Sequence, residues 1–172
     1  TNYMSNQMRR LDRLVTAGAT IPDVIILSAG TNSATVTGNF DTIMAMTLTT
    51  LEADTSTKQT FYGGMRYTLE RILRDYKNST PIVFSPIQAA IDLSAGRSFS
   101  ELELVNVAMK KMCRRLGIAF IDSLGNSGIY DRNEFTNGSG DYLSDGLHPN
   151  TAGKLLLKDF YSKSVVNSFY VK

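Results

Sequence analysis

The only histidine of the chain, His148, stands in a short segment whose residue types could perform acid–base chemistry (residues 145–150, DGLHPN). Asp145 precedes it by three positions, so a turn would bring the carboxylate to the Nδ1 side of the imidazole ring. Nε2 would then be free to take a proton from a nucleophile. A lone histidine in a loop before a helix can also be purely structural, so its interpretation depends on the rest of the chain.

A second candidate lies far upstream, where residues 28–33 (SAGTNS) directly follow the apolar run 23–27 (DVIIL). A buried strand that ends in Gly-Thr-Asn places the side chain of Asn32 at the carboxyl edge of a sheet. Open α/β folds bind their ligands at that edge. An Asx turn at Asn32 and a positive φ at Gly30 would explain the same residues structurally, and both interpretations can hold together.

Together, Gly-Thr-Asn after a strand and Asp-Gly-Leu-His-Pro-Asn near the C-terminus resemble the third and fifth sequence blocks of the SGNH or GDSL-type esterase/acylhydrolase superfamily. The resemblance implies that Asn32, with Gly30 in the same block, serves the oxyanion or substrate. It also implies a Ser-His-Asp triad in which His148 is the base and Asp145 orients it. Asp141 is an alternative partner for His148, although the spacing favours Asp145.

The implied activity is acyl transfer to water on a small-molecule or carbohydrate ester, with carbohydrate deacetylation as one specific form. The nucleophile is missing, because the sequence contains neither Gly-Asp-Ser nor a Gly-x-Ser-x-Gly elbow. We therefore expect the serine, together with the first two strands, in a segment that precedes Thr1, and this fragment alone to be inactive.

Neither serine near the Gly-Thr-Asn block is a good substitute. Ser33, where many family members have Asp, stands beside Asn32, and the two groups could not approach one carbonyl from suitable directions. Ser28 is expected near the end of a buried strand. A protein that has lost its nucleophile would instead be a non-catalytic carbohydrate- or ligand-binding domain on the same fold.

Hydrophobic periodicity predicts the elements that position these residues. Short apolar strands are expected at 21–29, 81–87 and 118–121, and amphipathic helices at 6–17, 61–76, 98–116 and from 150 or 151 onward. Alternating strands and helices imply parallel strands joined by right-handed crossovers. The resemblance implies one SGNH-hydrolase-like domain over 1–172, N-terminally incomplete, with a flavodoxin-like three-layer α/β/α architecture. Its absent first strand would lie beside 23–27, which is otherwise left with an open edge.

The same periodicity predicts which side chains are buried. The strand at 21–29 is almost wholly apolar and is expected to be covered on both faces, Cys113 should lie in the core, and Arg66 should face solvent. Segment 31–60 is a candidate substrate-facing loop or lid, or a plain connector, with a short helix near 40–51. The predicted inward-facing residues of the four helices are Met8, Leu11, Leu14 and Val15; Met65, Leu69, Ile72, Leu73 and Tyr76; Leu102, Val105, Met109 and Met112; and Leu155, Leu156, Phe160 and Tyr161.

Composition excludes several other functions. The net charge of +2 arises from 18 basic and 16 acidic residues that are well mixed, so no basic stripe predicts nucleic-acid binding. No run of 18 apolar residues is present that could span a membrane. One histidine and one cysteine cannot form a usual zinc site, and neither a calcium loop nor a phosphate-binding glycine loop is present. We expect no metal and no cofactor. The loop from Tyr130 to Tyr142 could contribute aromatic side chains to a sugar- or lipid-binding cleft.

Overall fold

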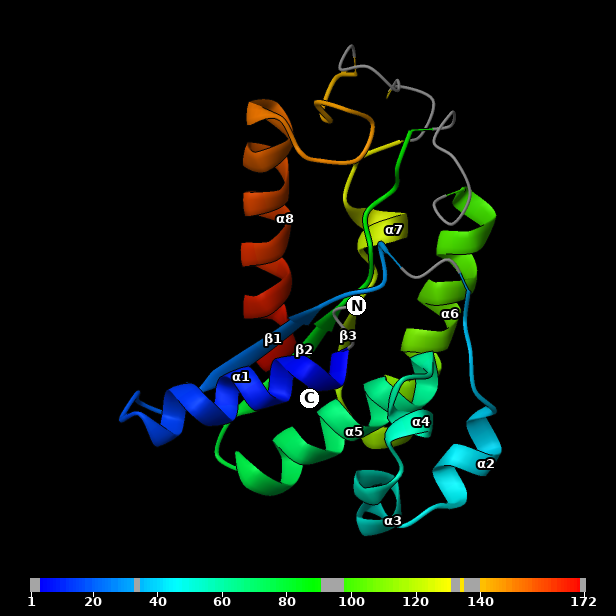
Figure 1. Cartoon of the computed structure of the whole chain (residues 1–172). Helices are drawn as coiled ribbons and strands as arrows, with labels where there is room; N and C mark the ends of the chain where they lie inside the picture. The colour runs from blue at the N-terminus through cyan, green and yellow to red at the C-terminus, as the bar shows by residue number, and fades with distance from the viewer. Residues whose placement is uncertain (1–3, 33–34, 91–97, 131–133, 135–139, 171–172) are drawn as a thin grey trace.

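A computed structural model describes residues 4–32, 35–90, 98–130, 134 and 140–170 (Figure 1). Its strands are β1 (Val24–Ser28), β2 (Thr80–Phe84) and β3 (Ala119–Ile121). No helix within these ranges is long and apolar enough to cross a membrane. The helices are α1 (Met4–Thr16), α2 (Phe40–Ala45), α3 (Leu48–Ala53), α4 (Thr55–Lys58), α5 (Phe61–Asp75), α6 (Phe99–Leu116), α7 (Ser123–Asn126) and α8 (Thr151–Tyr170).

The three strands form a parallel sheet in the order β1-β2-β3. Ile26 lies opposite Ile82, and Val83 lies opposite Phe120. Helix α5 precedes β2 and α6 precedes β3, as expected for parallel strands joined by crossovers. The predicted mixed α/β fold with a parallel sheet is therefore confirmed. The ends of the predicted strands differ from the observed ends by at most three residues.

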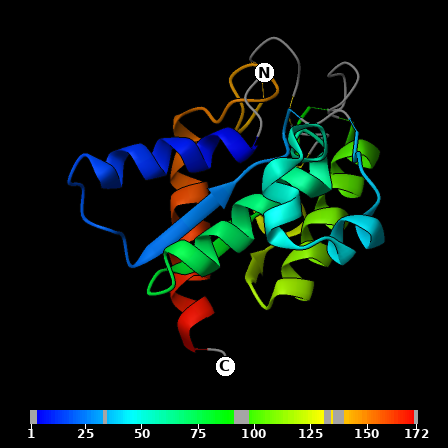
Figure 2. The same cartoon turned by 60° about the horizontal axis from the view of Figure 1, so that its bottom comes forward.

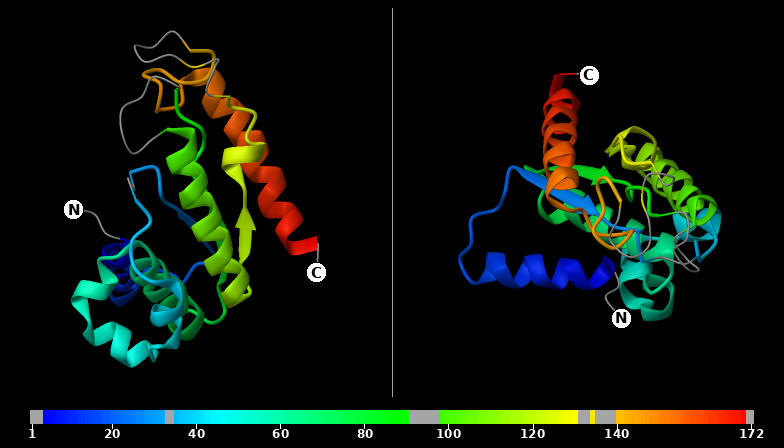
Figure 3. Two further views of the ribbon diagram at one scale, coloured as in Figure 1. Left: turned by 90° about the vertical axis from the view of Figure 1, so that its right-hand side faces the viewer. Right: turned by 90° about the horizontal axis from the view of Figure 1, so that it is seen from above.

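Helices cover both faces of the sheet. In the right-hand view of Figure 3, α8 lies on one side of the strands and α1 lies on the other. Alternate residues of β2 reach the two layers, as a pleated strand requires. Val83 packs into the cluster formed with α5 and α6, whereas the ring of Phe84 meets that of Tyr161 from α8 edge-on at 4.6 Å.

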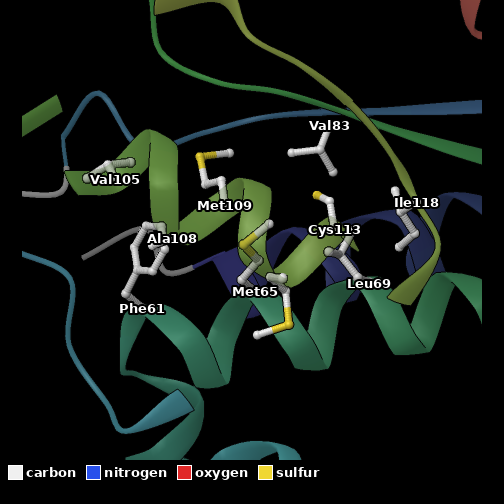
Figure 4. Packing of buried hydrophobic residues seen from close by; sticks show 10 residues of the cluster. Phe61, Met65, Leu69, Val83, Val105, Ala108, Met109, Cys113 and Ile118 are labelled. Atoms are coloured by element: carbon white, nitrogen blue, oxygen red, sulfur yellow. The ribbon is translucent and has the colours of Figure 1, made fainter. Parts of the chain in front are cut away.

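The main core lies between α5, α6 and the sheet (Figure 4). Met65, Met109 and Cys113 are fully buried there, so the prediction that Cys113 is a core residue is confirmed. Burial raises the pKa of the Cys113 thiol to about 12. Helix α6 begins with a capping box, in which Ser98 accepts from the backbone N–H of Glu101 and the Glu101 carboxylate accepts from Ser98.

Strand β1 lies at one edge of the sheet (Figure 2). Ile25 and Leu27 pack against the core on the side of α1 and α5. Ile26 points to the opposite face, where its side chain is 54% exposed. The prediction of a strand covered on both faces is therefore wrong within the described part of the chain, because the helix on that face, α8, packs against β2.

Three predicted core positions are also wrong. Leu14, Leu73 and Leu155 are 56%, 40% and 61% exposed. Each stands at the border of its helix's apolar stripe, where a shift of one position moves a side chain into solvent. Among the described side chains of α8, Leu157 is the buried hydrophobic one, at 7% exposure.

Arg66 was predicted to face solvent but is only 5% exposed. The reason is that α2 and α3 cover this face of α5. The guanidinium donates to the carbonyl oxygens of Ile43 and Met46, which are at the C-terminal end of α2, and pairs with Glu70 at 2.9 Å. Segment 35–60 thus forms α2, α3 and α4, all packed on α5.

Candidate active site

Residues 143–149 form a short hairpin turn that its own side chains stabilise. Leu143 and Pro149 make an isolated antiparallel bridge, and the N–H of Ser144 donates to the carbonyl oxygen of His148 at 2.8 Å. At the closed end, Oδ1 of Asp145 accepts from the backbone N–H groups of Leu147 (3.0 Å) and His148 (2.7 Å). This is an Asx-type turn, which holds the carboxylate beside the imidazole.

The other oxygen of the same carboxylate reaches the ring. Oδ2 of Asp145 lies 2.7 Å from Nδ1 of His148. The pKa of Asp145 is lowered to about 2. The largest cause is its hydrogen bond to the imidazole, and the backbone N–H groups of His148 and Leu147 contribute less. An ionised carboxylate only accepts hydrogen bonds, which assigns the proton of a neutral imidazole to Nδ1. Nε2 is thereby left with its lone pair.

A pocket of about 380 Å³ joins this turn to the carboxyl edge of the sheet. The loop after β1 contributes Asn32 and the loop after β2 contributes Ser85, while His148 comes from the turn. The two sequence motifs are therefore brought to one pocket. Its full lining is Ser28, Thr31, Asn32, Ser85, Pro86, Ile87, Leu147, His148, Pro149, Leu157 and Tyr161.

Gly30 lines no part of this pocket in the described structure. Its φ is +104°, and a Cβ built on it would lie 2.6 Å from Cγ1 of Val105 and 3.0 Å from Cγ of Pro86. Glycine is therefore required by backbone conformation and by the close approach of α6. Its predicted role toward the substrate stays a prediction.

Two polar residues that line the pocket, Ser85 and Tyr161, were not predicted as site residues. Ser85 is 1% exposed, and its Oγ accepts from the N–H groups of Ser123 (2.8 Å) and Leu124 (3.2 Å), tying the end of β2 to α7. The available signal was its position directly after an apolar strand, at the carboxyl end where Asn32 also lies. Tyr161 follows Leu157 by one helical turn on α8, and burial raises the pKa of its hydroxyl.

Other predicted site residues fall elsewhere. Ser28 ends β1, as predicted, but it is exposed and lines the pocket. The carbonyl oxygen of Asp141 accepts from the side chain of Asn150, and it is Asp145 that contacts His148. Ser33 and most of the loop from Tyr130 to Tyr142 lie outside the described residues. Thr31 and Asn32, at the start of segment 31–60, line the pocket, whereas the described residues of 35–60 do not, and the role of this segment as a lid stays a prediction.

Comparison with known proteins shows the family of this chain. Residues 2–156 match the model of the GDSL-like Lipase/Acylhydrolase family. The chain belongs to this family. Membership supports hydrolysis of ester bonds as the general activity. No curated protein sequence matches the chain significantly.

Solved structures share the fold of this family member at low sequence identity. A possible lipase from Chitinophaga pinensis DSM 2588 superposes with a TM-score of 0.66 and 16% identity, covering 99% of this chain and 81% of the other. A protein from Lactobacillus plantarum gives a TM-score of 0.63 at 17% identity, over 89% and 71%. A lipase/acylhydrolase from Enterococcus faecalis gives 0.58 at 18%, over 95% and 70%.

Proposed function

We propose that the protein is a serine-dependent ester hydrolase whose triad takes its base, His148, and its acid, Asp145, from this chain. The observation that carries the proposal is the 2.7 Å contact between Asp145 Oδ2 and His148 Nδ1 at a pocket that Asn32 also lines. The substrate is a small-molecule or carbohydrate ester, and deacetylation of a carbohydrate is one specific form. Family membership supports the general reaction.

Each group has a defined task in this mechanism. The serine hydroxyl attacks the ester carbonyl while Nε2 of His148 takes its proton and then returns it to the leaving alcohol. Asp145 holds the ring and stabilises the imidazolium that forms. The side-chain N–H of Asn32 donates to the developing oxyanion. Water then hydrolyses the acyl-enzyme, and His148 acts as base a second time.

We place the nucleophile outside these 172 residues. Ser85 is poorly suited, since its Oγ is buried and already accepts two backbone N–H groups. Strand β1 pairs only with β2 among the described strands, and Ile26 is exposed beside that edge. A further parallel strand at this position would end beside Asn32, so that the residue after it would enter the pocket.

The test uses the full-length protein with p-nitrophenyl acetate as substrate. His148→Ala removes the base and should lower kcat by several orders of magnitude. Asn32→Ala removes one oxyanion donor and should lower kcat by about 10²–10³ with a small change in KM. Asn78→Ala is the matched control. Asn78 is exposed just before β2, at the amino-terminal ends of the strands and away from the pocket, so its replacement should leave kcat unchanged.

Two results would contradict the proposal. Wild-type turnover in both site variants, combined with weaker retention on a polysaccharide column, would favour a carbohydrate-binding domain. A fluorophosphonate that labels Ser28 or Ser33, located by mass spectrometry, would place the nucleophile within this chain.

A further inference from the structure

Glu134 is a buried acidic residue that lies outside the pocket. Its side chain is fully buried, and its two oxygens bind successive backbone groups. Oε1 accepts from the N–H of Tyr142 at 2.8 Å, and Oε2 accepts from the N–H of Leu143 at 2.7 Å. Burying a carboxylate is costly unless strong hydrogen bonds compensate. The two hydrogen bonds therefore fix the backbone at Tyr142 and Leu143 to the Glu134 carboxylate.

Tyr142 and Leu143, which donate to Glu134, form one side of the hairpin that carries His148. Leu143 pairs with Pro149, and the carbonyl oxygen of Tyr142 accepts from the N–H of Asn150 at 2.8 Å. His148 therefore stands on the opposite side of a hairpin whose first side is fixed by Glu134. The position of the imidazole relative to the sheet depends on this anchor as well as on the packing of Leu143 with Ile129 and Leu157.

We propose that Glu134 is a positioning residue for catalysis, which fixes the hairpin so that His148 faces the pocket with its ring bound to Asp145. The inference rests on the proposed function. Both backbone N–H groups require an acceptor, and a carboxylate supplies two. In Glu134→Gln one oxygen becomes an NH₂ donor that faces a backbone N–H, so one side of the clamp is lost. A displacement of about 1 Å in a catalytic group can cost about 10²-fold in rate.

The experiment compares Glu134→Gln with wild type in the full-length protein. We expect kcat for p-nitrophenyl acetate to fall about 10–100-fold while KM changes less than about twofold, since Glu134 lines no part of the pocket. The second readout is ¹⁵N NMR of the imidazole, assigned with His148→Ala. Wild type should show the Nδ1–H tautomer, and Glu134→Gln should show a mixture with the Nε2–H form.

Asp54→Asn is the matched control. The Asp54 carboxylate also accepts a backbone N–H, that of Thr57 at 2.9 Å, but it caps α4, which packs on α5 away from the pocket. We expect it to lower the midpoint of urea unfolding without changing kcat or the imidazole spectrum. If Glu134→Gln does not fold, Gly140→Ala replaces it, because a Cβ at Gly140 would overlap the Glu134 carboxylate and displace it without altering its chemistry.

The outcomes separate the two proposals. Wild-type kcat and an unchanged tautomer in the Glu134 or Gly140 variant would overturn the positioning role, and so would a loss of activity that only follows the unfolded fraction. Full turnover in His148→Ala would instead refute the proposed function. The imidazole spectrum reports on Glu134 in either case, because it does not depend on ester turnover.

Discussion

Replacing Gly30 by alanine tests why glycine follows β1. A φ of +104° costs an L-residue about 1–2 kcal/mol. The new Cβ would lie 2.6 Å from Val105 Cγ1 and 3.3 Å from Met109 Sδ, and such overpacking typically costs about 1–3 kcal/mol. We therefore expect Gly30→Ala to lower the free energy of unfolding by about 2–5 kcal/mol. That is a large part of the 5–15 kcal/mol that is usual for a domain.

Gly18 supplies the control, because its φ is +93° and an added Cβ would meet no atom within 4 Å. Gly18→Ala should cost only the conformational part, about 1–2 kcal/mol. Urea unfolding followed by far-UV circular dichroism measures both changes. With an m-value of about 2 kcal/mol/M, the midpoint should fall by about 1–2.5 M for Gly30→Ala. Equal losses in the two variants would show that contact with α6 does not constrain Gly30.

Two further predictions concern titratable groups. Cys113 is buried and its pKa is raised to about 12. Iodoacetamide at pH 8 should therefore leave this thiol unmodified in the native protein and alkylate it in concentrated urea. Rapid labelling of the native protein would contradict the core position of Cys113. The pKa of Asp145 is lowered from 3.8 to about 2, so its stabilising contribution is complete above pH 3.8 and is lost as the pH falls toward 2. Asp145→Asn should therefore be less stable than wild type at pH 6, with the difference shrinking by pH 2.5 in urea titrations, and a difference that grows on acidification would refute this.

Periodicity identified the strands and the long helices because each carries its own apolar pattern. The capping box at Ser98 and Glu101 was predictable for the same reason, since it depends on residues three apart. The coverage of β1 could not be predicted. Ile25, Ile26 and Leu27 are chemically alike, and only the packing of α8 against β2 leaves Ile26 exposed. The burial of Arg66 likewise depends on α2 and α3, whose weak pattern gave no sign that they cover α5.

Within the candidate site, too, some features could be predicted from the sequence and others could not. The contact between Asp145 and His148 is local, and its spacing predicted it. The strand-end rule placed Asn32 at the carboxyl ends of the strands, whereas the resemblance to the family implied that His148, which follows no strand, lines the same pocket. Ser85 and Tyr161 were missed, since serines after strands and tyrosines in helices are common and most have no role in a site. Glu134 was missed because its partners are backbone groups, which leave no signature in the sequence.

Different contacts fix the orientation of the imidazole and its distance from Asn32. Asp145 orients the imidazole through hydrogen bonds made within the turn, and Glu134 anchors the hairpin that carries this turn. The distance from His148 to Asn32 is instead set by the sheet, by α8 and by the anchor at Glu134. The tautomer of His148 is thus a property of the anchored hairpin, whereas alignment of His148 with the proposed oxyanion donor, Asn32, is a property of the whole fold. Changes that leave Glu134 and its two hydrogen bonds in place should therefore alter alignment while leaving the Asp145–His148 contact intact.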